Sequence, residues 1–149
     1  MKKIKKYFSC LFSTVLLVLI WAEFASAGAI VVVVNKDNNI SKLSKRSLER
    51  IYKGKRTKWQ NGAPVKIIVP APGSREMQAL LSAIGVSSED ALAKLHLKLV
   101  YQQKLSGEPP KMSSEEAVQA VAKDKGAIAV VDSDKASGNV KVIEVEGLN

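Results

Sequence analysis

The fold is decided by a stretch that reads Lys66-Ile67-Ile68-Val69-Pro70-Ala71-Pro72-Gly73-Ser74-Arg75-Glu76-Met77-Gln78-Ala79-Leu80-Leu81. It predicts a buried strand over 65–69, a turn rich in Pro and Gly, and a helix over 74–84 with Ser74 as its N-cap. The first N–H groups of a helix have no intrahelical acceptor, and the helix dipole adds partial positive charge there. A strand that runs into a helix N-terminus is therefore a common anion pocket. Arg75 adds a full charge, so we expect an anion site at Gly73, Ser74 and Arg75.

Strands and helices alternate along the rest of the chain. Apolar, β-branched runs predict buried strands at 29–35 and 127–132, and a partly alternating run predicts a strand with an edge position or one wet face at 140–145. Caps and apolar stripes predict helices at 44–54, 88–104 and 113–125, the last opened by a capping box of Ser113 and Glu116. This order predicts an α/β domain, with a mostly parallel sheet of about four strands flanked by helices.

Ligands of such sheets lie beyond the carboxyl ends of the strands. In this sequence those ends are Asn35, the turn at 70–74, and Asp132-Ser133. Each of these strand ends is followed by polar or small residues rather than by further apolar residues. We therefore add Asn35 and Ser133 to the candidate anion site.

The first 27 residues have the pattern of a signal peptide. Four lysines precede an apolar run at 11–20, and Ala25-Ser26-Ala27 is a small-x-small cleavage site. Cleavage after Ala27 would export the protein to the periplasm and leave one domain, Gly28 to Asn149; an uncleaved membrane anchor is the alternative. The only cysteine, Cys10, lies inside the signal. The processed chain would then form no disulfide and no thiolate metal site.

Composition narrows the function. Removal of residues 1–27 takes four lysines and Glu23 with it and leaves 19 basic and 13 acidic residues, a net charge of +6. Such a balance attracts small anions, anionic membranes or nucleic acid, and export argues against nucleic acid. A denser basic run is interpreted as a solvated helix face: Lys42, Lys45, Arg46, Arg50, Lys53, Lys55, Arg56 and Lys58.

Nothing in the sequence favours an enzyme. The processed chain has no cysteine, a single isolated histidine (His96) and no Gly-x-Ser-x-Gly elbow. Asp132 and Asp134 have no acidic cluster elsewhere to complete a metal site, and they fit a strand-end turn better. We expect a non-enzymatic protein with no metal and no cofactor.

Several passages together are similar to a known family. They are Val31 to Asn35, the helix with Tyr52-Lys53-Gly54-Lys55 followed by Trp59-Gln60-Asn61-Gly62, the Pro72-Gly73-Ser74 helix start, and Gly126 to Val130. Their order resembles the phosphate-binding proteins of ABC importers, in the type 2 periplasmic binding-protein superfamily. Full-length members have two lobes with the anion between them, and this chain resembles a single lobe.

The resemblance implies binding of phosphate or a similar oxyanion, and an inner-membrane transporter or a second copy of the chain as partner. In the relatives the turn typically runs Arg-x-x-Gly-Ser-Gly-Thr. Gly73 and Ser74 match this pattern, whereas Pro70, Arg75 and Glu76 stand where arginine, glycine and threonine would be. We therefore expect weak anion binding. The alternative is an envelope accessory protein that keeps the fold but has lost the ligand.

Overall fold

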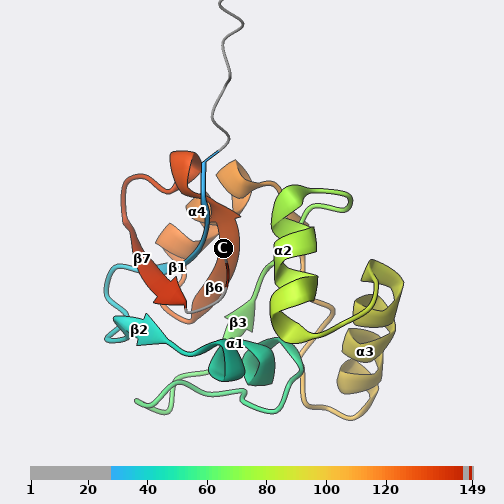
Figure 1. Cartoon of the computed structure of the whole chain (residues 1–149). Helices are drawn as coiled ribbons and strands as arrows, with labels where there is room; N and C mark the ends of the chain where they lie inside the picture. Colours follow the sequence, from blue (N-terminus) through green and yellow to red (C-terminus); the bar gives the residue numbers. More distant parts are fainter. Residues whose placement is uncertain (1–27, 146–147, 149) are drawn as a thin grey trace, which may run out of the picture.

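A computed structural model describes residues 28–145 and 148. Its centre is a five-stranded sheet in the order β2-β7-β1-β6-β3 (Figure 1). In chain order these strands are β1 (Ile30–Asn35), β2 (Lys42–Leu43), β3 (Lys66–Ile67), β6 (Ala127–Asp132) and β7 (Val140–Val145). The predicted α/β class is confirmed.

The sheet is mixed rather than uniformly parallel. β1 runs antiparallel to both of its neighbours, with Val32 opposite Val130 of β6 and Ile143 of β7. β2 is parallel to β7 and β3 is parallel to β6, so β1 alone points the other way. The apolar run of β1 indicated burial on both faces but carried no information about direction. The expectation of a mostly parallel sheet missed this reversal, which matters for the site.

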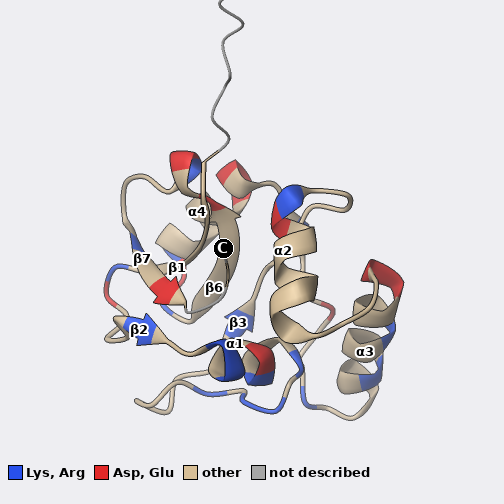
Figure 2. Ribbon diagram, viewed as in Figure 1, with Lys and Arg blue, Asp and Glu red and all other residues tan. Residues whose placement is uncertain are grey.

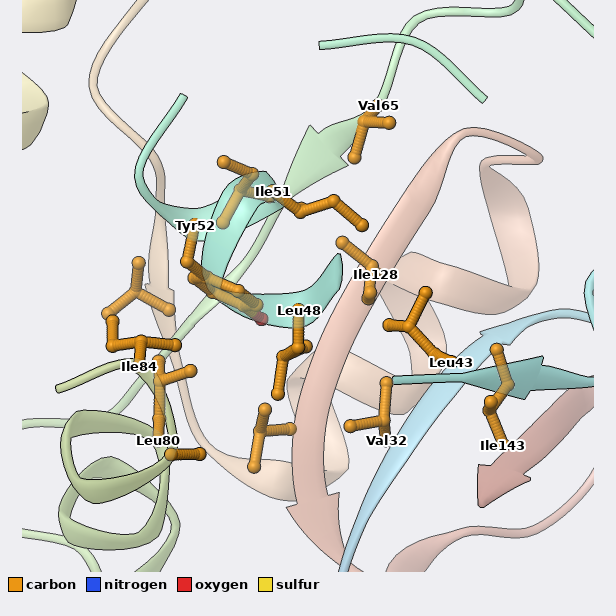
Figure 3. Packing of buried hydrophobic residues seen from close by; sticks show 14 of the residues in the cluster. Val32, Leu43, Leu48, Ile51, Tyr52, Val65, Leu80, Ile84, Ile128 and Ile143 are labelled. Carbon is orange, nitrogen blue, oxygen red and sulfur yellow. The ribbon is translucent and has the colours of Figure 1, made fainter. Parts of the chain in front are cut away.

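Helices cover both faces of the sheet (Figure 1). On one face α1 (Lys45–Tyr52) and α2 (Arg75–Ile84) pack over Val32 and Val34 of β1, as Figure 3 shows for α1 and Val32. On the other face α4 (Ser114–Lys123) packs over Val33. Successive side chains of a strand point to opposite faces, so β1 contributes to both cores.

The predicted strand over 65–69 is divided between two sheets. Lys66 and Ile67 pair with β6, whereas β4 (Val69–Pro70) pairs with β5 (Lys111–Met112) in a separate two-stranded sheet. The change occurs at Ile68, whose carbonyl accepts a 2.9 Å hydrogen bond from the buried hydroxyl of Tyr52. This bond holds the chain where it leaves the main sheet and turns towards α2.

The third helix, α3 (Glu89–Tyr101), lies outside α2 (Figure 1). It buries Leu92, His96 and Leu99. His96 is 3% exposed, and its Nε2 lies 2.8 Å from the carbonyl oxygen of Tyr52. Because a carbonyl only accepts, Nε2 carries the proton. Burial lowers the pKa of His96 below its usual value, so a neutral ring packs here.

Candidate functional site

The turn between β4 and α2 has the predicted N-cap. Ser74 Oγ accepts from the N–H of Met77 at 3.1 Å and donates to the carbonyl of Ala71 at 2.7 Å. Gly73 has φ +73°, a left-handed conformation that favours glycine. The hydroxyl of Ser74 is thus already used within the turn, in contact with the first orphan donors of α2.

A carboxylate of the protein itself lies at the same turn. The N–H of Gly73 donates to Oε1 of Glu89, the first residue of α3, at 2.8 Å. This is the kind of contact that a bound anion would make at a helix start. Glu89 therefore competes for Gly73, and it ties α3 to the turn.

Arg75 points towards the beginning of the described chain. Its Nη2 donates to the carbonyl of Gly28 at 2.9 Å, and its Nη1 lies 3.8 Å from Oδ2 of Asp132. About half of the side chain is exposed, so the ion pair is worth little. The arginine nevertheless links the start of β1 to the end of β6, beside the turn.

A hollow of about 240 Å³ opens next to Ser74. The N-terminal ends of α2 and α4 and the carboxyl end of β6 bound it, so two helix starts face one space. The lining residues are Pro70, Ala71, Ser74, Glu76, Met112, Ser113, Ser114, Glu115, Val130, Asp132 and Lys135. The capping box predicted for Ser113 and Glu116 is present and forms one wall.

The charges around this hollow are mixed. Ser114 Oγ donates to Oε1 of Glu76 at 2.6 Å and accepts from the N–H of Asp132 at 3.0 Å. Lys135 Nζ lies 2.8 Å from Oε1 of Glu115. The hydrogen bond from Lys135 lowers the pKa of Glu115, and the same bond raises the pKa of Lys135. Three carboxylates, those of Glu76, Glu115 and Asp132, thus border the space that an anion would enter.

Four of the five candidate residues come together and one does not. Gly73, Ser74 and Arg75 are consecutive, and Ser133 follows Asp132 at the end of β6, with its N–H on the carbonyl of Ala29 at 2.8 Å. Asn35 lies at the opposite end of the strands, because β1 is antiparallel to β6 and Ile30, not Asn35, is opposite Asp132.

Asn35 has a structural contact of its own. It is 4% exposed, and its Nδ2 donates to the carbonyls of Val121 and Ala122 near the end of α4, both at 2.9 Å. Both donors are therefore used where α4 ends, and the amide acts as a C-terminal partner for that helix.

Sequence reasoning missed Ser114, Glu115 and Lys135 as neighbours of Ser74. The capping box at Ser113 was a visible signal of a second helix start, but its closeness to Ser74 depends on the β4–β5 pairing. Within residues 28–145 and 148, no three His, Cys, Asp or Glu side chains are grouped as a metal ion would need. In that same part of the chain, no helix has the length and hydropathy to span a bilayer.

Solved structures with the same fold are larger than this chain. A protein described as a phosphate ABC transporter substrate-binding protein from Clostridium perfringens, with bound phosphate, matches with a TM-score of 0.62 and 20% identity. The match covers 82% of this chain and 46% of that one. An ABC-type phosphate transport receptor from Vibrio cholerae matches with a TM-score of 0.62 and 18% identity, over 80% of this chain and 47% of the other.

PstS from Borrelia burgdorferi gives a TM-score of 0.58 and 12% identity, over 80% of this chain and 48% of the other. The chain thus spans about half the length of these structures, which share its fold. Among curated proteins no relative matches. The model of the PBP superfamily domain matches residues 20–146. This confirms the resemblance and the PBP-like α/β fold. The chain belongs to the PBP superfamily.

Proposed function

We propose that the protein is an exported, non-enzymatic binding protein that holds phosphate or a similar oxyanion weakly at the N-terminus of α2. One observation carries the proposal: the N-termini of α2 and α4 bound the same hollow, and Ser74, Ser113 and Ser114 line it. Two helix starts supply unpaired N–H groups and two positive dipole ends to one space, which suits a small anion.

The fold supports this choice of ligand. The Clostridium perfringens relative contains phosphate, and the Vibrio cholerae relative is a phosphate transport receptor. The match covers 46% and 47% of these two proteins, so about half of each lies outside the region that matches this chain. We propose that a second copy or an inner-membrane transporter component covers the open side of the hollow.

The binding we propose is weak because the site's groups already have partners. Ser74 is bound to Ala71, Gly73 to Glu89, and the guanidinium of Arg75 to Gly28. An incoming anion must displace these contacts and approach Glu76. We therefore propose a dissociation constant of about 1 mM, which corresponds to roughly 4 kcal/mol of binding free energy. The proposed contacts remain Gly73, Ser74, Arg75 and Ser133. Ser74 lines the hollow, and each of the other three is next in sequence to a residue that lines it.

Export is part of the proposal. Residues 1–27 lie outside the described part of the chain, and we propose that they are removed after Ala27 in transit to the periplasm. The residue after that position is Gly28, whose carbonyl accepts the hydrogen bond from Arg75. Processing at Ala27 would therefore leave this contact in place.

Calorimetric titration of the processed protein with phosphate tests the proposal, with Arg75→Glu as the variant. We expect weak saturable heat for the unaltered protein and none for Arg75→Glu, because the cation next to Ser74 becomes an anion. Lys94→Glu is the matched control, since Lys94 is exposed on α3 and, unlike Arg75, has no neighbour in sequence that lines the hollow. Equal affinity in the unaltered protein and Arg75→Glu would place the site elsewhere.

An envelope accessory protein without a ligand is the second candidate. The observation in its favour is that no buried side-chain nitrogen or oxygen in the described residues lacks a hydrogen-bond partner. The buried side-chain groups thus have partners without an anion, and Ser74 would be only a helix cap worth about 1 kcal/mol. Absence of heat up to 20 mM phosphate, roughly twenty times the proposed dissociation constant, with native circular dichroism would favour this candidate.

A further inference from the structure

The net positive charge of the molecule is concentrated in one segment. Residues 42–58, which we call the basic segment, contain eight lysines and arginines and one acidic residue, Glu49. The other described residues contain eleven basic and eleven acidic side chains. The basic segment therefore supplies the whole positive excess of the described chain. A solvated helix face explains one or two such residues but not this segregation.

The structure presents these cations to solvent. Leu48, Ile51 and Tyr52 turn the apolar side of α1 into the core. Lys42, Lys45, Arg46, Arg50, Lys55 and Lys58 are exposed, and Arg56 is half-buried. Lys53 pairs with Glu49 at 2.9 Å, while the other seven cations of the basic segment form no ion pair with any described residue.

The surface extends onto the end of α3. Gly54 touches Leu99 so closely that an added Cβ would be 2.6 Å from Leu99 Cδ1. The C-terminal end of α3 therefore adjoins the basic segment, and in Figure 2 the blue of α1, of the loop after it and of the end of α3 lies at the lower side of the view. Tyr101, the last residue of α3, is 81% exposed. An exposed tyrosine beside cations suits the boundary between a bilayer and water.

We propose that the basic segment docks the protein on an anionic phospholipid surface. Phospholipid headgroups spread negative charge over an extended plane, which matches long, exposed and unpaired cations better than a small ligand does. A second copy would bring the same positive surface into contact with itself and be repelled. Export, as proposed above, separates the protein from nucleic acid. The hollow is lined by the N-terminal end of α2, and this end of the helix lies at the upper side of Figure 2, so docking leaves the hollow open.

Because this docking rests on charge, its strength should depend on the salt concentration and on the fraction of anionic lipid. Exposed charges interact over a Debye length of about 10 Å at 0.1 M salt and about 30 Å at 0.01 M. Each basic residue near an anionic bilayer strengthens binding by roughly five-fold, so removal of three weakens it by roughly 100-fold. The proposed docking does not require phosphate binding, so only a measurement of lipid binding tests it.

Vesicle sedimentation of the processed protein tests the proposal. The vesicles are phosphatidylcholine alone, or phosphatidylcholine with a quarter phosphatidylglycerol, in dilute buffer. We expect binding to the anionic vesicles only, loss of binding as salt is raised, and no competition from inorganic phosphate beyond its ionic strength. The combined variant Arg46→Gln, Arg50→Gln and Lys55→Gln is expected to lower the partition coefficient by roughly 100-fold.

The matched control removes three charges elsewhere. Lys36, Lys111 and Lys123 are exposed and form no ion pair within the described residues, and their change to Gln is expected to alter partitioning by less than about five-fold. Equal losses in both triple variants would overturn the proposal, because overall charge would then suffice. Absence of binding to anionic vesicles by the folded protein would also overturn it, as would equal binding to neutral ones. Binding to soluble heparin but not to vesicles would indicate a different polyanion.

Discussion

Removal of one hydroxyl, in Tyr52→Phe, should destabilise the fold at the point where the chain turns towards the candidate site. Tyr52 is fully buried, and its hydroxyl donates to the carbonyl of Ile68 at 2.9 Å. Ile68 lies between β3 and β4, is 5% exposed, and its own N–H bonds to Ile128. The carbonyl therefore depends on Tyr52 for its hydrogen bond.

The expected loss of stability follows from the carbonyl of Ile68, which would be left without a hydrogen-bond donor. Phenylalanine fills the same ring space, so no large cavity forms, and the cost is that of an unsatisfied buried acceptor, about 1–3 kcal/mol. With a slope near 1.5 kcal/mol/M, a loss of about 2 kcal/mol moves the urea midpoint down by roughly 1.3 M. Tyr101→Phe is the control, because Tyr101 is 81% exposed and its change should stay within about 0.5 kcal/mol.

The pH dependence of stability in the alkaline range gives a second test of the burial of Tyr52. Burial raises the pKa of Tyr52 above its ordinary value of about 10, so above that pH the unfolded chain loses this proton first. Its contribution to stability is then lost at up to about 1.4 kcal/mol per pH unit, and Tyr52→Phe should lack that part of the decline. Equal urea midpoints at pH 7 for Tyr52→Phe and Tyr101→Phe would refute the role of the Ile68 hydrogen bond.

Three further perturbations test other parts of the structure. Gly54 and Gly85 have almost the same φ, +65° and +64°, but only at Gly54 would an added Cβ meet Leu99, at 2.6 Å. Both Ala variants should lose about 1 kcal/mol from backbone strain, and thermal unfolding should show a further loss of about 1–3 kcal/mol for Gly54→Ala alone. The pKa of His96 is lowered by burial, so the unfolded chain binds this proton first. Stability should therefore fall below about pH 6.5, by at most about 1.4 kcal/mol per unit, and urea titrations of His96→Gln should lack that part of the decline. Glu89→Ala frees the N–H of Gly73 and removes a negative charge, so calorimetry should show several-fold tighter phosphate binding; unchanged or weaker binding would contradict the competition between Glu89 and the anion.

Local signals were sufficient for the helices. Ser44, Ser74, Ser88 and Ser113 each cap the helix predicted for them, because a cap and its first turn are neighbours in sequence. Strand pairing was less accessible. Three features depend on pairing partners far along the chain: the reversed direction of β1, the division of the 65–69 run at Ile68, and the two-residue strand β2.

For the candidate site, too, the local features could be predicted from the sequence and the tertiary ones could not. The cap at Ser74 was predicted, but the opening of α4 onto the same hollow was not, because that depends on tertiary pairing. Asn35 was expected near Ser74 only because β1 was taken as parallel, and its amide instead bonds to the end of α4. The contact of Arg75 with Gly28 joins residues that are 47 apart in sequence, beyond the reach of local patterns.

A crystal structure of the processed protein grown in about 10 mM phosphate would test the central claim most directly, at roughly ten times the proposed dissociation constant. We predict tetrahedral density in the hollow, in contact with Ser74 and the first N–H groups of α2, with Glu89 moved away from Gly73. A well-ordered map in which the hollow holds only water, and Glu89 keeps its bond to Gly73, would contradict the claim that this fold binds an oxyanion at the N-terminus of α2.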